Sequence, residues 1–208
     1  MRRDMAGDEQ RNKTDRGSAG RALRSDAERT VRRILEAAER VLRDDPAAPV
    51  ERIAEAAGVA RTTIHRRFAS REALIDEMTL WAVRQFGAAV LADRPDTLPP
   101  LVALHQVTAD VLRIKIGWGY AMSRGGAADS EVARIHADVR AECDRLFRRA
   151  RDAGVVRADV EIDWARRVYY ALIHEATQHP PADGDTDALA SQVVNTLLHG
   201  IGSADRAG

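Results

Sequence analysis

Apolar residues recur at spacings of three and four along most of the chain, which is the repeat of amphipathic α-helices. Alternation of β-branched residues, which would indicate strands, is nearly absent. We therefore expect an all-α fold of about nine helices. The predicted helices cover residues 25–43, 50–57, 60–68, 70–91, 97–116, 120–124, 129–153, 163–179 and 186–201.

Capping and breaking residues predict where these helices start and stop. Ser25 and Glu28 have the spacing of a capping box, so the first helix is expected to begin there. The Asp-Asp-Pro run at residues 44–46 ends it, and Gly58 can take the left-handed conformation that ends the second helix. Residues 1–24 are rich in Arg and poor in apolar groups, which predicts a flexible basic tail.

The run GVARTTIHRRF, residues 58–68, packs many hydrogen-bonding side chains into a short helix. With Ile64 at the centre of the buried side, Phe68 falls on the same side, whereas Thr62 and Arg66 lie nearly opposite. A short helix, a turn and a second helix with a polar outward face are typical of a helix-turn-helix, whose second helix enters a DNA major groove. A solvated helix face explains the same charges, so the charge pattern alone does not decide.

The run ILEAAERVL from Ile34 and the run VERIAEAAGVARTTIHRRFASREAL from Val50 to Leu74 resemble the N-terminal DNA-binding domain of TetR-type transcriptional regulators. The elements I-A-x-x-A-G-V, x-T-x-x-x-x-F and S-[KR]-E-x-L occur together and in order. The resemblance implies that bases are contacted by Arg61 and Thr62, and phosphates by Thr63, His65 and Arg71. Arg66 shares the outward face and completes the expected DNA-binding set.

The sequence departs from the family pattern at several of these positions. His65 replaces the usual Tyr, and Arg71 replaces the usual Lys while keeping its charge. Pro49 replaces a Thr that often binds a phosphate, and it offers neither a hydroxyl nor an N–H. Ala60 stands where a capping Ser is common, which removes about 1 kcal/mol of helix stabilisation.

The resemblance also implies how the rest of the chain is organised. We expect a helix-turn-helix domain at residues 25–70 and a larger helical domain at residues 71–205 that binds a ligand and dimerises. In such regulators the last two long helices of each subunit form a four-helix bundle, although an apolar stripe on these helices is also compatible with burial inside one monomer. The expected dimer interface comprises Val168, Leu172, Val194, Leu197, Leu198 and Ile201.

A cavity for a small organic ligand needs apolar and aromatic walls with a few polar groups. The aromatic, His and Met side chains of the predicted C-terminal domain are the candidates, and each of them is also compatible with an ordinary core or surface position. The candidate ligand-binding residues are Trp81, His105, Trp118, Tyr120, Met122, Tyr170 and His174.

Composition and charge are consistent with a DNA-binding protein of the cytoplasm. The formal net charge is zero, but residues 1–75 hold 17 Lys and Arg against 13 Asp and Glu, which favours a polyanionic partner. Cys143 is the single cysteine, so an internal disulfide is excluded. No apolar run is long enough for a membrane span and no signal segment is present, so we expect a cytoplasmic protein without a membrane partner.

An enzyme or a metal site is the alternative from another functional class. The run HEATQH at residues 174–179 resembles the zinc-protease element H-E-x-x-H with one extra residue. Five steps along a helix turn the second His about 140° away from the first, so the two imidazoles do not reach one metal. His105, His136 and His199 are scattered, and no glycine-rich phosphate-binding motif occurs.

The sequence thus predicts a homodimeric transcriptional regulator, by the family's usual sign a repressor. Its expected partners are double-stranded DNA with a palindromic operator and an unknown small-molecule ligand. We expect no enzymatic activity, no metal and no cofactor. A DNA-architectural protein without a ligand and a helical hydrolase or metal-binding protein remain the alternatives.

Overall fold

The computed structural model describes residues 5–92, 97–124, 130–182 and 184–201, with side chains from residue 25 onward except those of Ser130 and Ile201. The long regular elements of this part of the chain are all helices, and the predicted all-α fold class is confirmed. The helices form two compact units, Met1–Glu77 and Met78–Gly208. The boundary therefore falls inside a helix that begins at Arg71, later than the one expected after residue 70.

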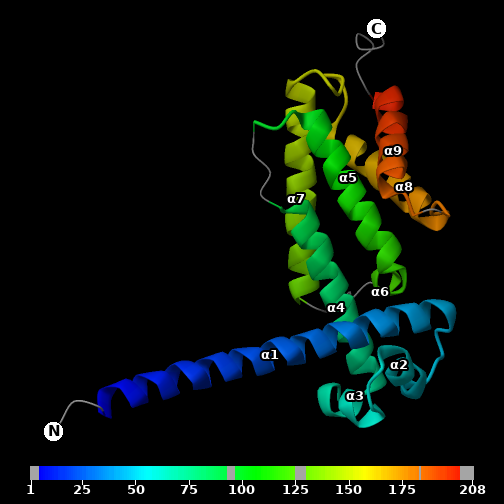
Figure 1. Cartoon of the computed structure of the whole chain (residues 1–208). Coiled ribbons are helices and arrows are strands. Elements are labelled where there is room, and N and C mark those ends of the chain that lie inside the picture. Colours follow the sequence, from blue (N-terminus) through cyan, green and yellow to red (C-terminus); the bar gives the residue numbers. More distant parts are fainter. Residues whose placement is uncertain (1–4, 93–96, 125–129, 183, 202–208) are drawn as a thin grey trace. The chain divides into compact units, whose positions relative to one another are not determined.

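The N-terminal unit consists of α1 (Met5–Asp44), α2 (Val50–Ala57), α3 (Arg61–Arg67) and the start of α4 (Arg71–Val90) (Figure 1). α2 contacts both α1 and α3. The predicted apolar stripes supply the core of this unit, whose buried side chains include Ile34, Leu35, Leu42, Ile53, Ile64, Phe68 and Leu74.

The turn between α2 and α3 depends on one glycine and one arginine. Gly58 has a φ of 63°, in the left-handed region that favours glycine, as the sequence predicts. Nη2 of Arg33 on α1 donates a hydrogen bond to the Ala57 carbonyl oxygen at 2.7 Å. Because that carbonyl is at the free C-terminal end of α2, the guanidinium both satisfies it and joins α1 to the turn.

The capping box predicted at Ser25 is wrong, because α1 begins at Met5 and runs through this position without a break. The Ser25 hydroxyl instead accepts a hydrogen bond from Arg29 one turn later. A capping pattern signals a helix start only where the preceding residues leave the helix, and here the backbone from Met5 onward stays helical. The mobility expected of residues 1–24 stays a prediction.

In its described residues, the C-terminal unit contains the rest of α4 and five further helices (Figure 1). These are α5 (Pro100–Gly117), α6 (Gly119–Ser123), α7 (Ser130–Asp152), α8 (Ile162–Gln178) and α9 (Thr186–Ile201). α5 contacts α7, α8 and α9, so it is the central helix of the unit. Each helix was predicted from the sequence within a few residues of its bounds.

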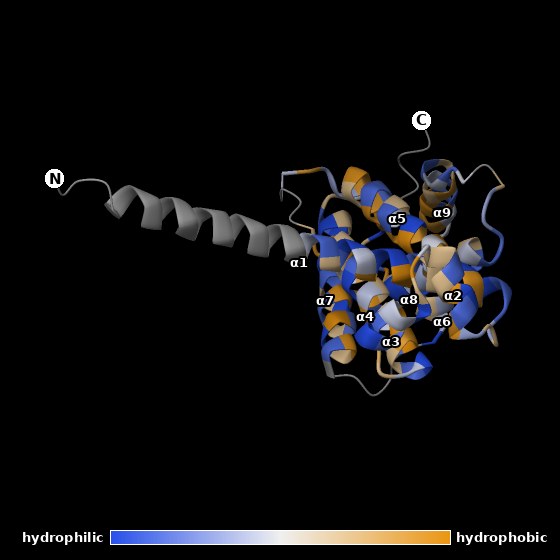
Figure 2. Cartoon of the chain, turned by 60° about the horizontal axis from the view of Figure 1, so that its bottom comes forward, coloured by the Kyte–Doolittle hydropathy of each residue, from blue (hydrophilic) through white to orange (hydrophobic). Residues whose placement is uncertain are grey.

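Apolar positions of α4, α5, α7, α8 and α9 meet in one core, and hydrophilic positions occupy the other faces of the same helices (Figure 2). α4 and α7 approach closely at Gly87, where an added Cβ would lie only 2.6 Å from Cγ2 of Ile135. Arg84 and Glu131 join the same helices through two hydrogen bonds of 2.9 and 3.0 Å. These contacts fix one side of a cavity described below.

Candidate functional site

The first candidate site is the outward face of α3. Ile64 and Phe68 anchor this helix in the core with 2% and 7% of their surface exposed. The side chains between and around them point outward, as the helical geometry predicts. Arg61, Thr62, His65, Arg66 and Arg67 are exposed, and Thr63 is half-buried.

Arg61 is held by two side chains on this surface. Its Nη1 lies 2.8 Å from Oε1 of Glu51 on α2, and its Nε donates a hydrogen bond to Nε2 of His65 at 3.0 Å. The sequence reasoning missed Glu51, because nothing in the helical spacing shows which residue of α2 faces α3.

Arg66 and Arg67 complete the basic character of the helix. Within the described part of the chain, neither guanidinium has an ion-pair partner. Both are therefore available to an anionic partner, together with the exposed hydroxyl of Thr62. Cationic and hydroxyl side chains of this kind make most of the phosphate and base contacts in protein–DNA complexes.

Arg71 has a structural role that the sequence did not show. Its Nη2 donates to the Pro46 carbonyl oxygen at 2.6 Å and its Nε donates to the Ala48 carbonyl oxygen at 3.3 Å. The side chain therefore ties the start of α4 to the loop between α1 and α2. A guanidinium has five N–H donors, so others remain for a phosphate, and that contact stays a prediction.

The helix starts in this unit are capped unequally. Pro49 and Ala60 are the N-cap residues of α2 and α3, and neither makes a side-chain capping bond, as their residue types predict. The Ser70 hydroxyl, in contrast, accepts a hydrogen bond from the backbone N–H of Ala73 at 3.0 Å and caps α4. The first N–H groups of α2 and α3 are thus free of side-chain caps.

The second candidate site is a cavity of about 430 Å³ in the C-terminal unit. It lies among α4, α5, α6, α7 and α8, and this volume is within the range of about 300–1,000 Å³ typical of small-molecule sites. Its lining residues are Phe86, Val90, Val107, Val111, Lys115, Met122, His136, Val139, Arg140, Cys143, Arg166, Tyr169, Tyr170 and Ile173. A smaller hollow of about 120 Å³ adjoins it at Val90, Val107 and Cys143.

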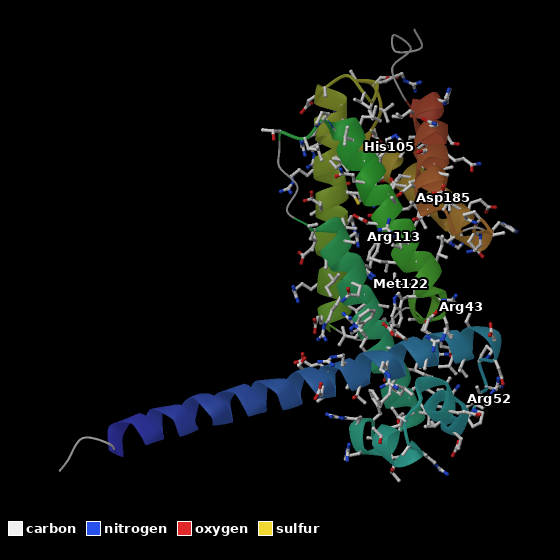
Figure 3. All side chains as sticks on the ribbon, in the orientation of Figure 1. Arg43, Arg52, His105, Arg113, Met122 and Asp185 are labelled. Atoms are coloured by element: carbon white, nitrogen blue, oxygen red, sulfur yellow. The ribbon has the colours of Figure 1, made fainter. Side chains whose placement is uncertain are left out.

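Two of the seven ligand-binding candidates, Met122 and Tyr170, line this cavity, and the other five do not. Trp81 and Trp118 pack on each other with ring centroids 4.4 Å apart. His105 lies toward the beginning of α5, whereas Met122 lies beyond its end (Figure 3).

The remaining two candidates are also engaged outside the cavity. The Tyr120 ring packs beneath the Arg124 guanidinium, 5.9 Å from the ring centroid. The His174 side chain is exposed on α8. These five residues therefore do not line the cavity described here, because residue type alone does not tell which face of a helix a side chain occupies, and their role in ligand binding stays a prediction.

The sequence reasoning missed the charged lining of the cavity, although a signal was present. Val107, Val111 and Lys115 follow each other at steps of four on α5, so a lysine stands where the apolar stripe predicts another apolar residue. On α7, His136 and Arg140 border the stripe that contains Val139. A cation inside or beside a buried stripe is the pattern that would have found them.

The cationic groups of the cavity influence one another. Burial lowers the pKa of Lys115, whose Nζ lies 5.7 Å from the centroid of the Phe86 ring. Burial also lowers the pKa of His136, and the positive charges of Lys115 and Arg140 lower it further. Arg166 differs from these groups, because the Asp144 carboxylate accepts its Nε hydrogen bond at 2.7 Å and the Asp163 carboxylate accepts a second hydrogen bond.

Uncharged polar groups complete the lining. The thiol of Cys143 and the hydroxyl of Tyr170 form a hydrogen bond, and burial raises the pKa of both groups. Both are therefore neutral near pH 7. The Tyr169 hydroxyl lies 2.9 Å from Oγ1 of Thr108, which itself donates to the Leu104 carbonyl oxygen. The polar side chains here are thus fixed by their own hydrogen bonds.

The residues of the expected dimer interface differ in their exposure on the monomer. Val194 and Leu197 of α9 are 0% and 1% exposed, because they belong to the core of the monomer and leave no surface for a partner. Val168, Leu172 and Leu198 are half-buried at the edge of that core. The Ile201 side chain lies outside the described residues.

Trp164 was missed as an interface candidate. It lies one turn before Val168 on α8, and 51% of its surface is exposed. An exposed tryptophan is unusual, but a single apolar residue outside the regular stripe gives no signal in the sequence.

The described residues contain neither a membrane-spanning helix nor a cluster of metal-ligating side chains. No helix in this part of the chain is long and apolar enough to cross a membrane. The same residues contain no group of three or more His, Cys, Asp and Glu side chains placed to hold a metal ion. The HEATQH run lies at the end of α8, where the Nδ1 atom of His179 is 3.9 Å from the Glu175 carboxylate.

The outward face of α3 and most of the cavity lining fall in two segments that match known families. Residues 34–78 match the family described as "Bacterial regulatory proteins, tetR family", and residues 107–203 match "Transcriptional regulator SbtR-like, C-terminal domain". The chain belongs to the TetR family of DNA-binding transcriptional regulators.

Solved structures of this family resemble the chain over most of its length. The TetR-like regulator LfrR from Mycobacterium smegmatis, in complex with proflavine, is 28% identical over 84% of this chain and 98% of LfrR, with a TM-score of 0.64. The regulator SCO0520 from Streptomyces coelicolor is 26% identical over 84% of this chain and 99% of its own, with a TM-score of 0.54. FadR from Bacillus subtilis, in complex with stearoyl-CoA, is 20% identical over 81% of this chain and 98% of FadR, with a TM-score of 0.58. It shares the fold. No curated protein sequence matches significantly.

Proposed function

We propose that this protein is a homodimeric repressor that binds a palindromic DNA operator through α3 and releases it when a small molecule occupies the cavity of the C-terminal unit. The observation that carries the proposal is the outward face of α3. Its Arg, Thr and His side chains are presented by a helix that Ile64 and Phe68 fix in the core. We also propose a cytoplasmic location, where the DNA target lies.

DNA contacts divide into two groups in this proposal. Arg61 and Thr62 at the start of α3 contact base edges, since the first residues of a recognition helix reach deepest into the major groove. Thr63, His65, Arg66 and Arg71 contact the phosphate backbone, which sets register and affinity. The ion pair of Arg61 with Glu51 supports its assignment as a base-reading residue, because the pair orients the guanidinium before DNA arrives.

Dimerisation is proposed through the outward surface of α8 and α9. Trp164, Val168 and Leu172 form an apolar strip along α8, and Leu198 adds to it from α9. A second copy that covers this strip would create a symmetric interface. Two copies are needed because one recognition helix reads too few base pairs to select a site, whereas a symmetric pair reads two half-sites.

Ligand control follows from the relation between two conformations. A ligand releases DNA only if it binds more tightly to a conformation whose recognition helices do not fit successive major grooves. The cavity of about 430 Å³ supports this part of the proposal. LfrR with proflavine and FadR with stearoyl-CoA show that relatives with this fold bind small or acyl-bearing molecules.

Selection of random double-stranded DNA by the full-length protein tests the proposal. We expect enrichment of one palindromic sequence, and the logarithm of its binding constant should fall linearly with the logarithm of salt concentration. An Ala substitution of Arg148, an exposed arginine of α7, serves as a matched control that should leave both results unchanged. Recovery of unrelated sequences with equal affinity would support a DNA-architectural protein instead and contradict the repressor.

A further inference from the structure

The cavity of the C-terminal unit has an unbalanced charge. Lys115 on α5, His136 and Arg140 on α7 and Arg166 on α8 all line it, and among the residues that the structure describes no Asp or Glu lines it. The remaining lining side chains are apolar, aromatic or uncharged polar groups. The cavity therefore has mostly apolar walls with several basic side chains, of which Lys115, Arg140 and Arg166 are cations.

Two of these cations have no compensating charge. Within the part of the chain that the structure describes, neither the Lys115 ammonium nor the Arg140 guanidinium has a carboxylate partner. Arg166 serves as the internal comparison, since Asp144 and Asp163 both accept hydrogen bonds from it. For the half-buried Lys115, an unpaired charge against an apolar wall is costly, and an opposite charge brought to it reduces that cost. The exposed Arg140 adds a second positive charge at the same cavity.

The two unpaired cations also act on the neighbouring His136. Lys115 and Arg140 both repel a proton from His136, which places the three groups around one region of the cavity. The Phe86 ring lies beside two of them, with the Lys115 Nζ 5.7 Å and the His136 ring 6.4 Å from its centroid. An anion that enters this region is attracted by both Lys115 and Arg140, and it also favours the protonated form of His136.

The rest of the cavity suits an apolar body. Val107, Val111, Val139, Met122 and Ile173 supply aliphatic walls next to the cationic region. We propose that the cavity binds an amphipathic organic anion, with its acidic group against Lys115 and Arg140 and its apolar body against these aliphatic side chains. The binding site stands on the cavity itself, and its regulatory consequence rests on the repressor function proposed above.

Direct binding to the full-length protein without DNA tests the charge of the ligand. Isothermal titration calorimetry with decanoate, decan-1-ol and decylamine compares three head groups on one chain, and 2-naphthoate, 2-naphthylmethanol and 2-naphthylmethylamine repeat the comparison on an aromatic body. We expect at least one of the two carboxylates to bind about tenfold or more tightly than its matched alcohol and amine. Equal or tighter binding by the alcohol or the amine in both series, or binding by no probe, overturns the proposal.

Substitutions locate the anion. Lys115→Gln and Arg140→Gln should each weaken carboxylate binding about tenfold and leave alcohol binding nearly unchanged, whereas Lys115→Arg should keep most of the affinity. Arg134→Gln is the matched control, because this exposed arginine is also on α7 but does not line the cavity. Arg140 is exposed, so its substitution tests the proposal even if a change at Lys115 impairs folding. Unchanged carboxylate affinity in the double variant Lys115→Gln, Arg140→Gln overturns the assignment.

Release of the selected DNA separates this inference from the repressor function. Carboxylate binding with the expected preference but without any loss of DNA affinity refutes ligand control and leaves the anion site supported. Release of DNA by the amine rather than the carboxylate refutes the anion site and leaves ligand control supported.

Discussion

The Nη1 atom of Arg61 on α3 lies 2.8 Å from Oε1 of Glu51 on α2, so the residue proposed to read bases is ion-paired before it meets DNA. His65 supports the same side chain by accepting its Nε hydrogen bond at 3.0 Å. The pair has two opposing effects, because it orients the guanidinium and also neutralises the charge that attracts phosphate and guanine. Removal of the ion pair therefore tests how it affects DNA binding by α3.

Glu51→Gln should raise DNA affinity about two- to fivefold without changing the preferred sequence. An exposed ion pair contributes about 0.2–1 kcal/mol, which is the amount that Arg61 must give up to reach a base. Fluorescence anisotropy with the selected DNA measures the change. Glu55→Gln on the exposed side of the same helix is the control for loss of a negative charge alone. An equal gain in DNA affinity for Glu55→Gln would show that the ion pair has no specific role.

Arg61→Ala and Arg71→Ala should impair DNA binding in different ways. Loss of Arg61 should cost about 1–3 kcal/mol per half-site and relax the preference at one base position, since arginine reads guanine through two hydrogen bonds. Loss of Arg71 should weaken binding to all sequences alike. It should also lower the free energy of unfolding by about 1–3 kcal/mol, because the Pro46 and Ala48 carbonyls lose their charged donor.

Binding-site selection and urea unfolding on both variants separate these roles. The same motif and the same stability for the two variants would show that the distinction between a base reader and a loop anchor is wrong. Arg71→Lys keeps the charge but loses the two-pronged geometry, so it should retain DNA affinity better than stability.

The double variant Trp164→Asp, Val168→Asp should be monomeric. Each charge would be buried against the apolar strip of the partner without an opposite charge, which costs several kcal/mol and raises the dimer dissociation constant about a hundredfold or more. Sedimentation measures the mass, and circular dichroism checks that the fold persists. Ala137→Asp at an exposed position of α7 is the control that should stay dimeric. A dimeric double variant would exclude this surface as the interface.

His136 should make the stability of the protein depend on pH. Burial first, then the charges of Lys115 and Arg140, lower its pKa below the ordinary value of 6.5, so the unfolded chain binds this proton more readily than the folded one. The contribution to stability is therefore full above about pH 6.5 and is lost as the pH falls from there toward the lower pKa of the folded state. His136→Gln removes this dependence.

Urea unfolding of both proteins between about pH 7.5 and about pH 5.5 measures the effect. As the pH falls, the free energy of unfolding of the wild type should decrease relative to that of His136→Gln. Parallel stability curves would show that His136 has the same pKa in the folded and unfolded chains.

Local sequence patterns were sufficient to predict most of the helices. The bounds of α2 and α9 follow from apolar repeats and breakers, because helix formation depends on neighbours three and four residues away. The same periodicity placed Ile64 inward and Thr62 outward on α3. A local pattern gave a wrong prediction where it is compatible with two structures. The capping pattern at Ser25 is the example, because it lies inside a continuous helix.

The candidate sites depended more on tertiary structure. The residues proposed to contact DNA could be selected from the sequence because most of them share one face of one short helix, whereas the Glu51 partner of Arg61 belongs to another helix. The lining of the cavity comes from five helices, and Lys115 joins Arg140 there only through the packing of α5 against α7.

The last two helices show most clearly what the sequence pattern does not determine. Periodicity established that Val194, Leu197 and Leu198 lie on or beside an apolar stripe, but a stripe has the same spacing whether it faces the same chain or a second copy. Packing against α5 and α8 decided that Val194 and Leu197 belong to the monomer core, and it left Trp164 on the surface. The sequence by itself thus determined which positions are apolar, and only the tertiary structure determined which surface buries them, because burial depends on residues that are distant in the chain.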